Sequence, residues 1–260
     1  MYIHDLNPVL FSLGSFKIYY YSLAYLFGFL LALFLLIRKR EKLGLSKDDC
    51  YDLTAWMIIG TIIGARLFEV LFWSPGYYYN HLIEIIAFWK GISGMSYHGG
   101  LFGLVIAVWL FSKKRKLAFL ELADVIVIPA ALALAFGRIG NFINGELVGT
   151  VTNVSWCVVF PLVDGCRHPQ QLYAAGYRFF IFFGLLGISK IKKKAGVVFF
   201  SYLLLEGIGR FAVDFFREDL HYLGLSLGQW FSIAMILIGG YLLMKNCFNP
   251  TKKLVQSKYL

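Results

Sequence analysis

Charge is scarce in this 260-residue sequence, in which only 15% of the residues are Asp, Glu, Lys or Arg. Hydrophobic residues make up 59% of the chain and aromatic residues 18%. A soluble globular domain has about 25% charged and about 45–50% apolar residues. The composition therefore excludes a disordered chain, a disulfide-stapled small domain and an ordinary cytosolic enzyme. It favours a polytopic membrane protein that faces mostly lipid.

Cysteines are also few, and their spacing matches no metal site. The four cysteines form no CxxC pair and no Cys/His pattern of the kind that binds a metal. Cys50 and Cys247 fall in segments that we assign to the reducing side of the membrane. Cys157 and Cys166 fall on the opposite side, where a disulfide between them is allowed.

The sequence lacks Pro-rich linkers, low-complexity tracts and repeats of about 20–50 residues. It also lacks a recognisable cleavable signal peptide. We therefore predict one membrane domain over residues 1–260, with one external excursion at 142–169. The run Val154–Phe160 within it is strand-like and is closed by Pro161. A small periplasmic head with short strands is predicted there, and a plain loop is the alternative.

Seven apolar stretches approach the length of about 17–25 residues that a helix needs to cross a bilayer. The third is short unless Ile92–Ser96 extends it. The stretches are roughly Ile18–Ile37, Tyr51–Trp73, Tyr97–Phe111, Ala118–Phe136, Leu172–Ser189, Gly196–Phe216 and Leu223–Met244. The sequence thus predicts an all-α polytopic membrane protein with seven transmembrane helices.

The basic residues alternate between crowded and sparse connecting segments. The crowded segments hold Arg38, Lys39, Arg40, Lys42 and Lys47; Lys113, Lys114, Arg115 and Lys116; Lys190, Lys192, Lys193 and Lys194; and Lys245, Lys252, Lys253 and Lys258. The sparse segments hold one each: Lys17, Lys90, Arg167 and Arg217. Cytoplasmic loops carry the excess of Lys and Arg. The N-terminus is therefore predicted outside and the C-terminus in the cytoplasm.

The net charge of +10 is explained by this orientation. The cations are scattered over several loops and follow no nucleic-acid-binding motif, so no nucleic acid partner is expected.

Four arginines remain: Arg66, Arg178 and Arg210 fall inside the apolar stretches, and Arg138 follows two residues after the end of the fourth. An arginine at the centre of a membrane helix costs about 2.5–3.5 kcal/mol on insertion scales, so such residues are expected to be paired or used. Arg178 stands on an otherwise apolar, aromatic stretch, and we expect it to snorkel to the membrane surface.

The other intramembrane polar residues fall on one side of the predicted bilayer. With the orientation given above, the outer half contains Tyr21, Arg66, Glu69, His98, Arg138, Glu206, Arg210 and Asp214. We interpret them as one polar site that opens toward the outer leaflet.

Helical spacing suggests which of these charges pair with each other. Glu206, Arg210 and Asp214 follow at intervals of four, so they share a helix face, and a structural ion-pair ladder is nearly as good an explanation as a site. Arg66 and Glu69 also share a face, and for them the structural ion pair is favoured.

Arg138 differs because residues 130–140 supply no acid within a helical turn. An arginine without such a partner suits an anionic ligand such as a phosphodiester, which a guanidinium binds bidentately.

His98 starts the third stretch, before Gly99 and Gly100. One interpretation is a helix-terminal histidine satisfied by backbone, with glycines that allow close helix packing. The other is a general acid or base, because an unperturbed imidazole titrates near pH 6.5.

At these positions the chain resembles the prolipoprotein diacylglyceryl transferase family of bacterial inner membranes. The most specific match is the ten-residue run Gly137–Glu146. The other matches are Ser96–Gly100, Arg167–Tyr173, Arg210–Phe211, Phe215–Glu218 and Leu225–Gln229. They occur in the family's order and cover nearly the whole chain.

The resemblance implies transfer of the diacylglyceryl group of phosphatidylglycerol to the lipobox cysteine thiol of a secreted prolipoprotein. A thioether forms and glycerol phosphate leaves, and the resemblance implies no cofactor and no metal. The expected location is the bacterial inner membrane, with phosphatidylglycerol, the lipobox segment and membrane lipid as partners. The family residues tied to function match Tyr21, His98, Arg138, Asn141, Glu146, Gly149 and Arg210.

The chemistry assigns roles to these residues. His98 is the candidate base for the thiol proton, and Arg138 and Arg210 are the candidates for stabilising the departing phosphate. Tyr21, Arg138, Asn141, Asn144, Glu146 and Gly149 are predicted to bind substrate. The chain departs from the family at Asp214, where Glu is common, and at Glu206, where a tyrosine can stand, so neither is predicted to be catalytic.

Two other functional classes are alternatives to a transferase. A transporter or channel would use the same buried charges but would show inverted repeats or paired broken helices, which we do not find. A non-catalytic scaffold that binds anionic lipid would also use the arginines, but it would not require bidentate binding by their guanidinium groups.

Overall fold

The computed structural model describes residues 2–14, 16–87, 94–191 and 194–248. The chain divides into two compact units. One comprises residues 26–129, and the other comprises residues 1–25 together with 130–260. The prediction of one domain over 1–260, with its excursion at 142–169, stays a prediction.

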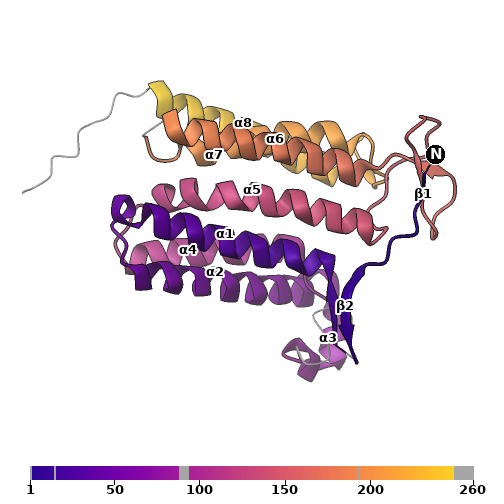
Figure 1. Cartoon of the computed structure of the whole chain (residues 1–260), viewed down its shortest axis with the longest axis horizontal. Helices are drawn as coiled ribbons and strands as arrows, with labels where there is room; N and C mark the ends of the chain where they lie inside the picture. Colours follow the sequence, from indigo (N-terminus) through magenta and orange to yellow (C-terminus); the bar gives the residue numbers. More distant parts are fainter. Residues whose placement is uncertain (1, 15, 88–93, 192–193, 249–260) are drawn as a thin grey trace, which may run out of the picture. The chain divides into compact units, whose positions relative to one another are not determined.

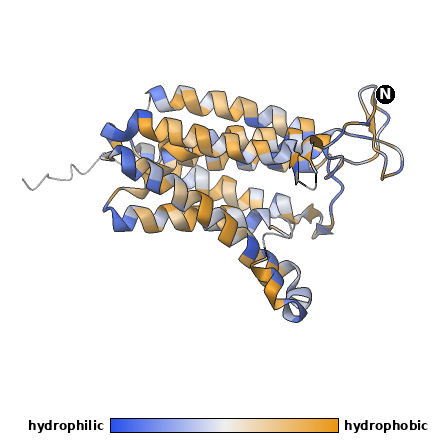
Figure 2. Ribbon diagram, turned by 60° about the horizontal axis from the view of Figure 1, so that its bottom comes forward, coloured by the Kyte–Doolittle hydropathy of each residue, from blue (hydrophilic) through white to orange (hydrophobic). Residues whose placement is uncertain are grey.

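Long helices account for most of the described ranges. Each of the seven predicted stretches coincides with one of these helices, and Figure 2 shows them hydrophobic along most of their length. They are α1 (Tyr20–Leu43), α2 (Lys47–Phe68), α4 (Tyr97–Lys114), α5 (Phe119–Ile143), α6 (Gln170–Ile191), α7 (Val197–Asp214) and α8 (Leu227–Phe248).

Five of these helices are long and apolar enough to cross a membrane: α1, α2 with its extension to Trp73, α5, α6 and α8. The helix α7 carries Glu206, Arg210 and Asp214 within eighteen residues, and α4 is an eighteen-residue helix that ends in two lysines. A mostly helical, polytopic membrane protein therefore agrees with the prediction. Seven crossings, with the N-terminus outside, stay a prediction.

Several helix ends differ from the predicted ones. Residues Ile18 and Tyr19 belong to a hairpin of β2 (Val9–Leu13) and β3 (Phe16–Tyr19), so the first helix begins only at Tyr20. Residues 94–96 do not extend the third helix, because Ser96 is the N-cap of α4 and its side chain accepts a hydrogen bond from the amide of Gly99. Ile92 lies outside the described residues.

Two further helix boundaries, in the C-terminal half of the chain, differ from the predicted ones. The helix α5 continues to Ile143, so the first two residues of the predicted excursion are helical. The last helix begins at Leu227 because a small hairpin precedes it, formed by β6 (His221–Tyr222) and β7 (Leu225–Ser226).

Short elements follow α2. They are the π-helix η1 (Glu69–Trp73), the helix α3 (Pro75–Asn80) and the 3-10 helix η2 (Leu82–Ile85). Lys90, in the next predicted loop, lies outside the described residues, as do Lys192, Lys193, Lys252, Lys253 and Lys258.

Glycines allow a close crossing of α2 and α4 in the unit of residues 26–129. A Cβ atom added to Gly64 would lie 2.8 Å from the Cα of Gly103, and one added to Gly60 would lie 2.6 Å from the Cβ of Ala107. Both distances are shorter than real Cβ contacts, so the two backbones touch. This crossing fixes the first turn of α4, where Gly99 packs against Gly64 next to His98.

A buried apolar cluster closes the same unit at the ends of its helices that carry the crowded basic loops. It includes Leu36, Leu53, Met57, Phe111 and Leu122, each with less than 2% of its surface exposed. Removal of such side chains from water contributes about 1.5–3 kcal/mol each.

In the other unit, α6, α7 and α8 lie side by side (Figure 1). A small sheet stands at one end of this unit, with the strand order β1 (Tyr2–Ile3), β4 (Val158–Val159) and β5 (Cys166–Arg167). The strands β1 and β4 are parallel, and β4 and β5 are antiparallel. Of the predicted strand-like run Val154–Phe160, only residues 158–159 form a strand.

We predict that Gly64→Ala will destabilise the protein, because the added methyl group has no space between α2 and α4. Overpacking of this kind costs about 1–3 kcal/mol. Thermal unfolding in detergent should show a lower Tm. The matched control is Gly184→Ala in α6, where an added Cβ meets nothing within 4 Å. Equal Tm values for the two variants would contradict the close crossing.

Candidate active site

Most of the predicted site residues lie in one unit. Residues 1–25 and 130–260 include the two candidate phosphate-binding residues, Arg138 and Arg210, and the candidate binding residues Tyr21, Asn141, Asn144, Glu146 and Gly149. The candidate base, His98, belongs to the unit of residues 26–129.

The carboxylate of Glu146 is held by two side-chain amides at the end of α5. Asn141 Nδ2 donates to Glu146 Oε1 over 2.7 Å, and Asn144 Nδ2 donates to the same oxygen over 3.1 Å. The backbone amide of Glu146 also donates to the carbonyl of Asn141, over 3.1 Å. Gly145 makes the reversal of the chain with a φ of +68°, which favours glycine. Glu146 is therefore preorganised while its side chain stays exposed.

Two buried glutamines at the start of α6 hold the same loop. Gln171 Nε2 donates to the carbonyl of Glu146 over 2.8 Å, and Gln170 Nε2 donates to the carbonyl of Leu147 over 2.5 Å. Both glutamine side chains are almost completely buried. They fix the backbone on the C-terminal side of Glu146.

Tyr21 lies against the α5 segment that carries the ten-residue match. A Cβ added to Gly140 would lie 3.0 Å from the Cα of Tyr21, so Gly140 lets α1 approach α5 at this point. The Tyr21 hydroxyl shares a hydrogen bond of 3.0 Å with the hydroxyl of Tyr25.

Arg138 is half-buried in the last third of α5. It lies close enough to Tyr177 of α6 for an electrostatic interaction. Tyr177 in turn packs on α7, because a Cβ added to Gly209 would lie 2.7 Å from its ring atom Cε2. One aromatic ring therefore contacts the residue before Arg210 and lies within electrostatic reach of Arg138.

The prediction that Arg178 snorkels is wrong. Its side chain is only 3% exposed and forms an ion pair with Glu206, which is 7% exposed. Arg178 Nη1 also donates to the carbonyl of Ala174 over 3.1 Å, and the Tyr177 hydroxyl donates to Glu206 Oε1 over 3.0 Å. The guanidinium stays inside because a carboxylate on the neighbouring helix α7 compensates its charge, which residue periodicity along α6 does not reveal.

The predicted ladder on α7 therefore splits into two pairs. Glu206 turns to Arg178 of α6, whereas Asp214 lies near Arg210, with 3.7 Å between Arg210 Nε and Asp214 Oδ2. This separation exceeds hydrogen-bonding distance. The Arg210 guanidinium is thus close to the Asp214 carboxylate, but Arg210 Nε does not form a hydrogen bond with Asp214 Oδ2.

Gly149 is buried where two backbone segments converge. It forms an isolated β-bridge with Arg217, and the amide of Thr150 donates to the carbonyl of Phe216 over 2.9 Å. A Cβ at residue 149 would lie 2.6 Å from that carbonyl oxygen. The packing gives Gly149 a structural reason to be glycine, and its predicted role in substrate binding stays a prediction.

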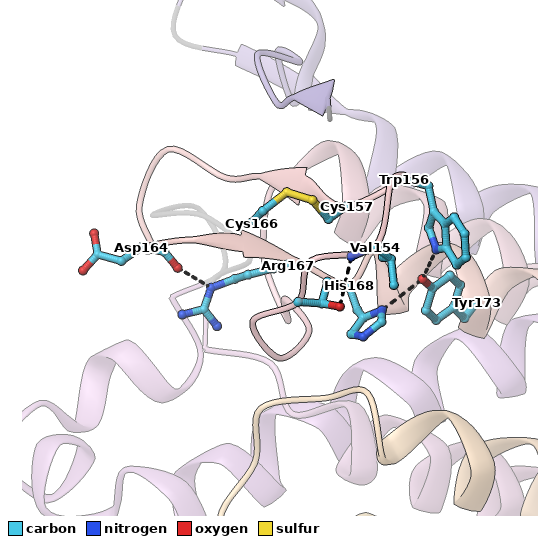
Figure 3. The surroundings of a disulfide bond; sticks show 9 residues. Val154, Trp156, Cys157, Asp164, Cys166, Arg167, His168 and Tyr173 are labelled. Atoms are coloured by element: carbon cyan, nitrogen blue, oxygen red, sulfur yellow. Dashed lines mark hydrogen bonds between the residues drawn. A yellow bond between two sulfur atoms is a disulfide. The ribbon is translucent and has the colours of Figure 1, made fainter.

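Arg167 joins three segments of the chain. It donates to the carbonyls of Gly149 over 3.1 Å and Asp164 over 2.9 Å, and it forms an ion pair with Glu218 after α7. Next to it, Cys166 forms a disulfide bond with Cys157, as the sequence allowed (Figure 3). The Tyr173 hydroxyl accepts a hydrogen bond of 2.7 Å from Trp156 Nε1 in the same region.

Within its own unit, His98 occupies the first turn of α4 and is exposed. Its ring lies edge-on to that of Tyr97, with 5.6 Å between the ring centroids. In the same unit, Arg66 donates to the Tyr78 hydroxyl over 2.8 Å and to the carbonyl of Gly94 over 3.1 Å. These bonds agree with a structural role for Arg66.

Comparison with known proteins assigns the family. The family model described as prolipoprotein diacylglyceryl transferase matches residues 8–245. The chain belongs to this family.

Relatives named phosphatidylglycerol–prolipoprotein diacylglyceryl transferase match nearly the full length. The protein of Geobacter sulfurreducens is 40% identical over 92% of this chain and 95% of its own length. That of Bordetella parapertussis is 40% identical over 95% of this chain and 98% of its own, and that of Rickettsia rickettsii is 38% identical over the same shares.

Several residues that hold candidate site residues of this diacylglyceryl transferase family member in place carry no signal of that role in the sequence. Gln170 and Gln171 were part of a recognised motif, but no role could be given to them without knowing which carbonyls they reach. Tyr177 had no signal at all, because one more aromatic residue in an aromatic helix does not stand out.

We predict that Arg178→Met will strongly destabilise the protein, because Glu206 is then left buried and unpaired. Breaking a buried pair costs about 3–5 kcal/mol. Denaturant unfolding in detergent would measure this loss, and the double variant Arg178→Met/Glu206→Leu should recover most of it. The control is Arg115→Met, which breaks the exposed contacts with Asp49 and Asp52 and should cost about 1 kcal/mol or less. A single variant no worse than this control would disprove the buried pair.

Proposed function

We propose that this protein transfers the diacylglyceryl group of phosphatidylglycerol to the lipobox cysteine of secreted prolipoproteins, the first step of lipoprotein maturation. The thiol sulfur forms a thioether bond to the glyceryl carbon, the carbon–oxygen bond to phosphate breaks, and glycerol phosphate leaves. The observation that carries the proposal is the family match over residues 8–245, together with relatives of this name that match nearly end to end.

Family membership favours this enzyme over the transporter and the lipid-binding scaffold considered from sequence. No cofactor enters the proposed reaction, because a thiolate displaces a phosphate ester oxygen without any change of oxidation state. Catalysis then consists of making the thiolate and stabilising the negative charge that develops on the departing phosphate.

Arg138 and Arg210 are the proposed phosphate-binding residues. Both are half-buried, where solvent screens charge less, so their attraction for an anion is stronger than at an exposed site. The Arg210 Nε atom is buried and has no hydrogen-bond partner among the described residues, so Asp214 does not take this donor. A guanidinium can bind phosphate oxygens bidentately.

The proposed headgroup-binding residues are Tyr21, Asn141, Asn144 and Glu146, with Gly149 behind them. Glu146 is the best-supported acceptor for a glycerol hydroxyl, because its carboxylate is already oriented by two amides and its backbone is held at both ends. Such preorganisation reduces the entropy that is lost when the headgroup binds.

His98 is the residue that we propose to accept the thiol proton. A free thiol with a pKa of about 8.5 is a poor nucleophile at neutral pH, and an imidazole can generate the thiolate. The proposed topology puts this chemistry at the outer leaflet of the bacterial inner membrane, where a secreted precursor presents its lipobox.

Purified protein mixed with phosphatidylglycerol and a lipobox peptide is expected to release glycerol phosphate without an energy source. In Arg138→Lys, bidentate binding is lost and the rate should fall about 100-fold, as for removal of one transition-state donor. Release of glycerol phosphate measured by chromatography gives both results. Arg115→Lys, at the predicted cytoplasmic face, serves as control and should keep its activity. An inactive wild type refutes the function, and full activity in Arg138→Lys refutes the role of this arginine.

His98→Ala is expected to lower the turnover rate by about 10²–10⁴-fold, because a positioned base contributes this much. The same assay across pH should show that the wild-type rate falls as acid protonates the base and that the residual rate of the variant lacks this inflection. His221→Ala, which removes another exposed histidine in β6, is the matched control. A fully active His98→Ala enzyme would remove His98 from the mechanism.

A further inference from the structure

The turn between α7 and α8 contains the motif Leu225–Gln229, to which the proposed mechanism gives no role. Ser226 and Gln229 form a capping box at the start of α8. The amide of Gln229 donates to Ser226 Oγ over 3.0 Å, and the amide of Ser226 donates to Gln229 Oε1 over 2.9 Å. Both side chains are about 1% exposed. The box therefore fixes the Ser226 hydroxyl oxygen in a single position.

The hydroxyl of Ser226 reaches beyond its own helix. It donates to Asp214 Oδ2 at the end of α7, over 3.3 Å. The same carboxylate oxygen lies 3.7 Å from Arg210 Nε. Ser226 and Arg210 thus compete for one oxygen atom, and the hydroxyl is the one within hydrogen-bonding distance.

Gly228 provides the space for this arrangement. A Cβ added at residue 228 would lie 2.8 Å from Arg210 Nη2 and closer still to Asp214 Oδ2. The first turn of α8 therefore lies against the guanidinium and the carboxylate, and a side chain at residue 228 would displace one or both of them.

We propose that Ser226 and Gly228 are positioning residues for the transfer reaction: Ser226 acts on Arg210 through Asp214, and Gly228 acts by leaving space for the guanidinium and the carboxylate. The hydrogen bond from Ser226 holds the Asp214 carboxylate away from Arg210. At that distance the carboxylate orients the Arg210 guanidinium without occupying its hydrogen-bond donors. This inference rests on the proposed role of Arg210 in binding the departing phosphate.

The physical consequence is a choice between two partners for Arg210. A carboxylate released from Ser226 can close on the guanidinium and form a hydrogen-bonded ion pair, which in a poorly screened site is strong. Arg210 would then have fewer donors and less net charge for the phosphate, and the loss would appear in kcat more than in KM.

The test compares Ser226→Gly with a matched cap elsewhere. Glycine is tolerated at an N-cap, so α8 should remain folded while the hydroxyl is lost. Ser46 caps α2 in the same way, with Asp49 as its partner, and Ser46→Gly removes an equivalent hydroxyl from a turn outside the site. We expect about a tenfold lower kcat for Ser226→Gly, unchanged kcat for Ser46→Gly, similar Tm values for both, and recovery of activity in Ser226→Thr.

A double-mutant cycle separates positioning from simple support of the fold. In an Asp214→Asn background the side chain cannot form the competing ion pair, so Ser226→Gly should change kcat by less than twofold. An equal loss in both backgrounds, or full activity of Ser226→Gly in the native background, would overturn the proposal.

Two further variants complete the test. Gly228→Ala should lower kcat at least as much as Ser226→Gly, whereas Gly184→Ala, made in open space, should not. Arg210→Gln identifies which claim has failed. If Arg210→Gln is inactive but Ser226→Gly and Gly228→Ala are fully active, only the positioning role is refuted; if Arg210→Gln is fully active, the phosphate-binding role of Arg210 is refuted and the positioning role with it.

Discussion

A charge inside a membrane protein must be paired or must bind something, because the hydrocarbon around it offers no compensation. In this chain the two outcomes occur on one helix. Glu206 of α7 forms an ion pair with Arg178 and accepts a hydrogen bond from Tyr177, so it links α6 to α7. One turn further along, Arg210 lies near Asp214 without a hydrogen bond between Nε and Oδ2. The first pair is part of the scaffold, and in the proposed mechanism the second leaves donors of Arg210 for the phosphate.

The rest of the unit serves to hold such groups in place. Glu146 depends on Asn141, Asn144 and Gln171, and Asp214 depends on Ser226. In each case a neutral amide or hydroxyl, itself fixed by a helix end, restrains a carboxylate. Neutral donors orient a carboxylate without occupying the guanidinium groups that are proposed to bind the phosphate.

The sequence predicted features that depend on local composition and failed where partners are distant. Apolar length located the seven long helices of the described residues, and cysteine position allowed the disulfide. The hairpin before α1 was missed because Ile18 is apolar enough to belong to a helix. Arg178 was misjudged because its partner, Glu206, is 28 residues away on another helix. Family resemblance marked Ser226 and Gln171, but only the coordinates show which atoms they reach.

The most direct test of the account is an experimental structure of the protein with bound phosphatidylglycerol. The account predicts the lipid phosphate within hydrogen-bonding distance of the guanidinium groups of both Arg138 and Arg210, with its glycerol headgroup at Glu146. A phosphate bound away from both arginines, or an Arg210 guanidinium hydrogen-bonded to Asp214 while the lipid binds elsewhere, would contradict it.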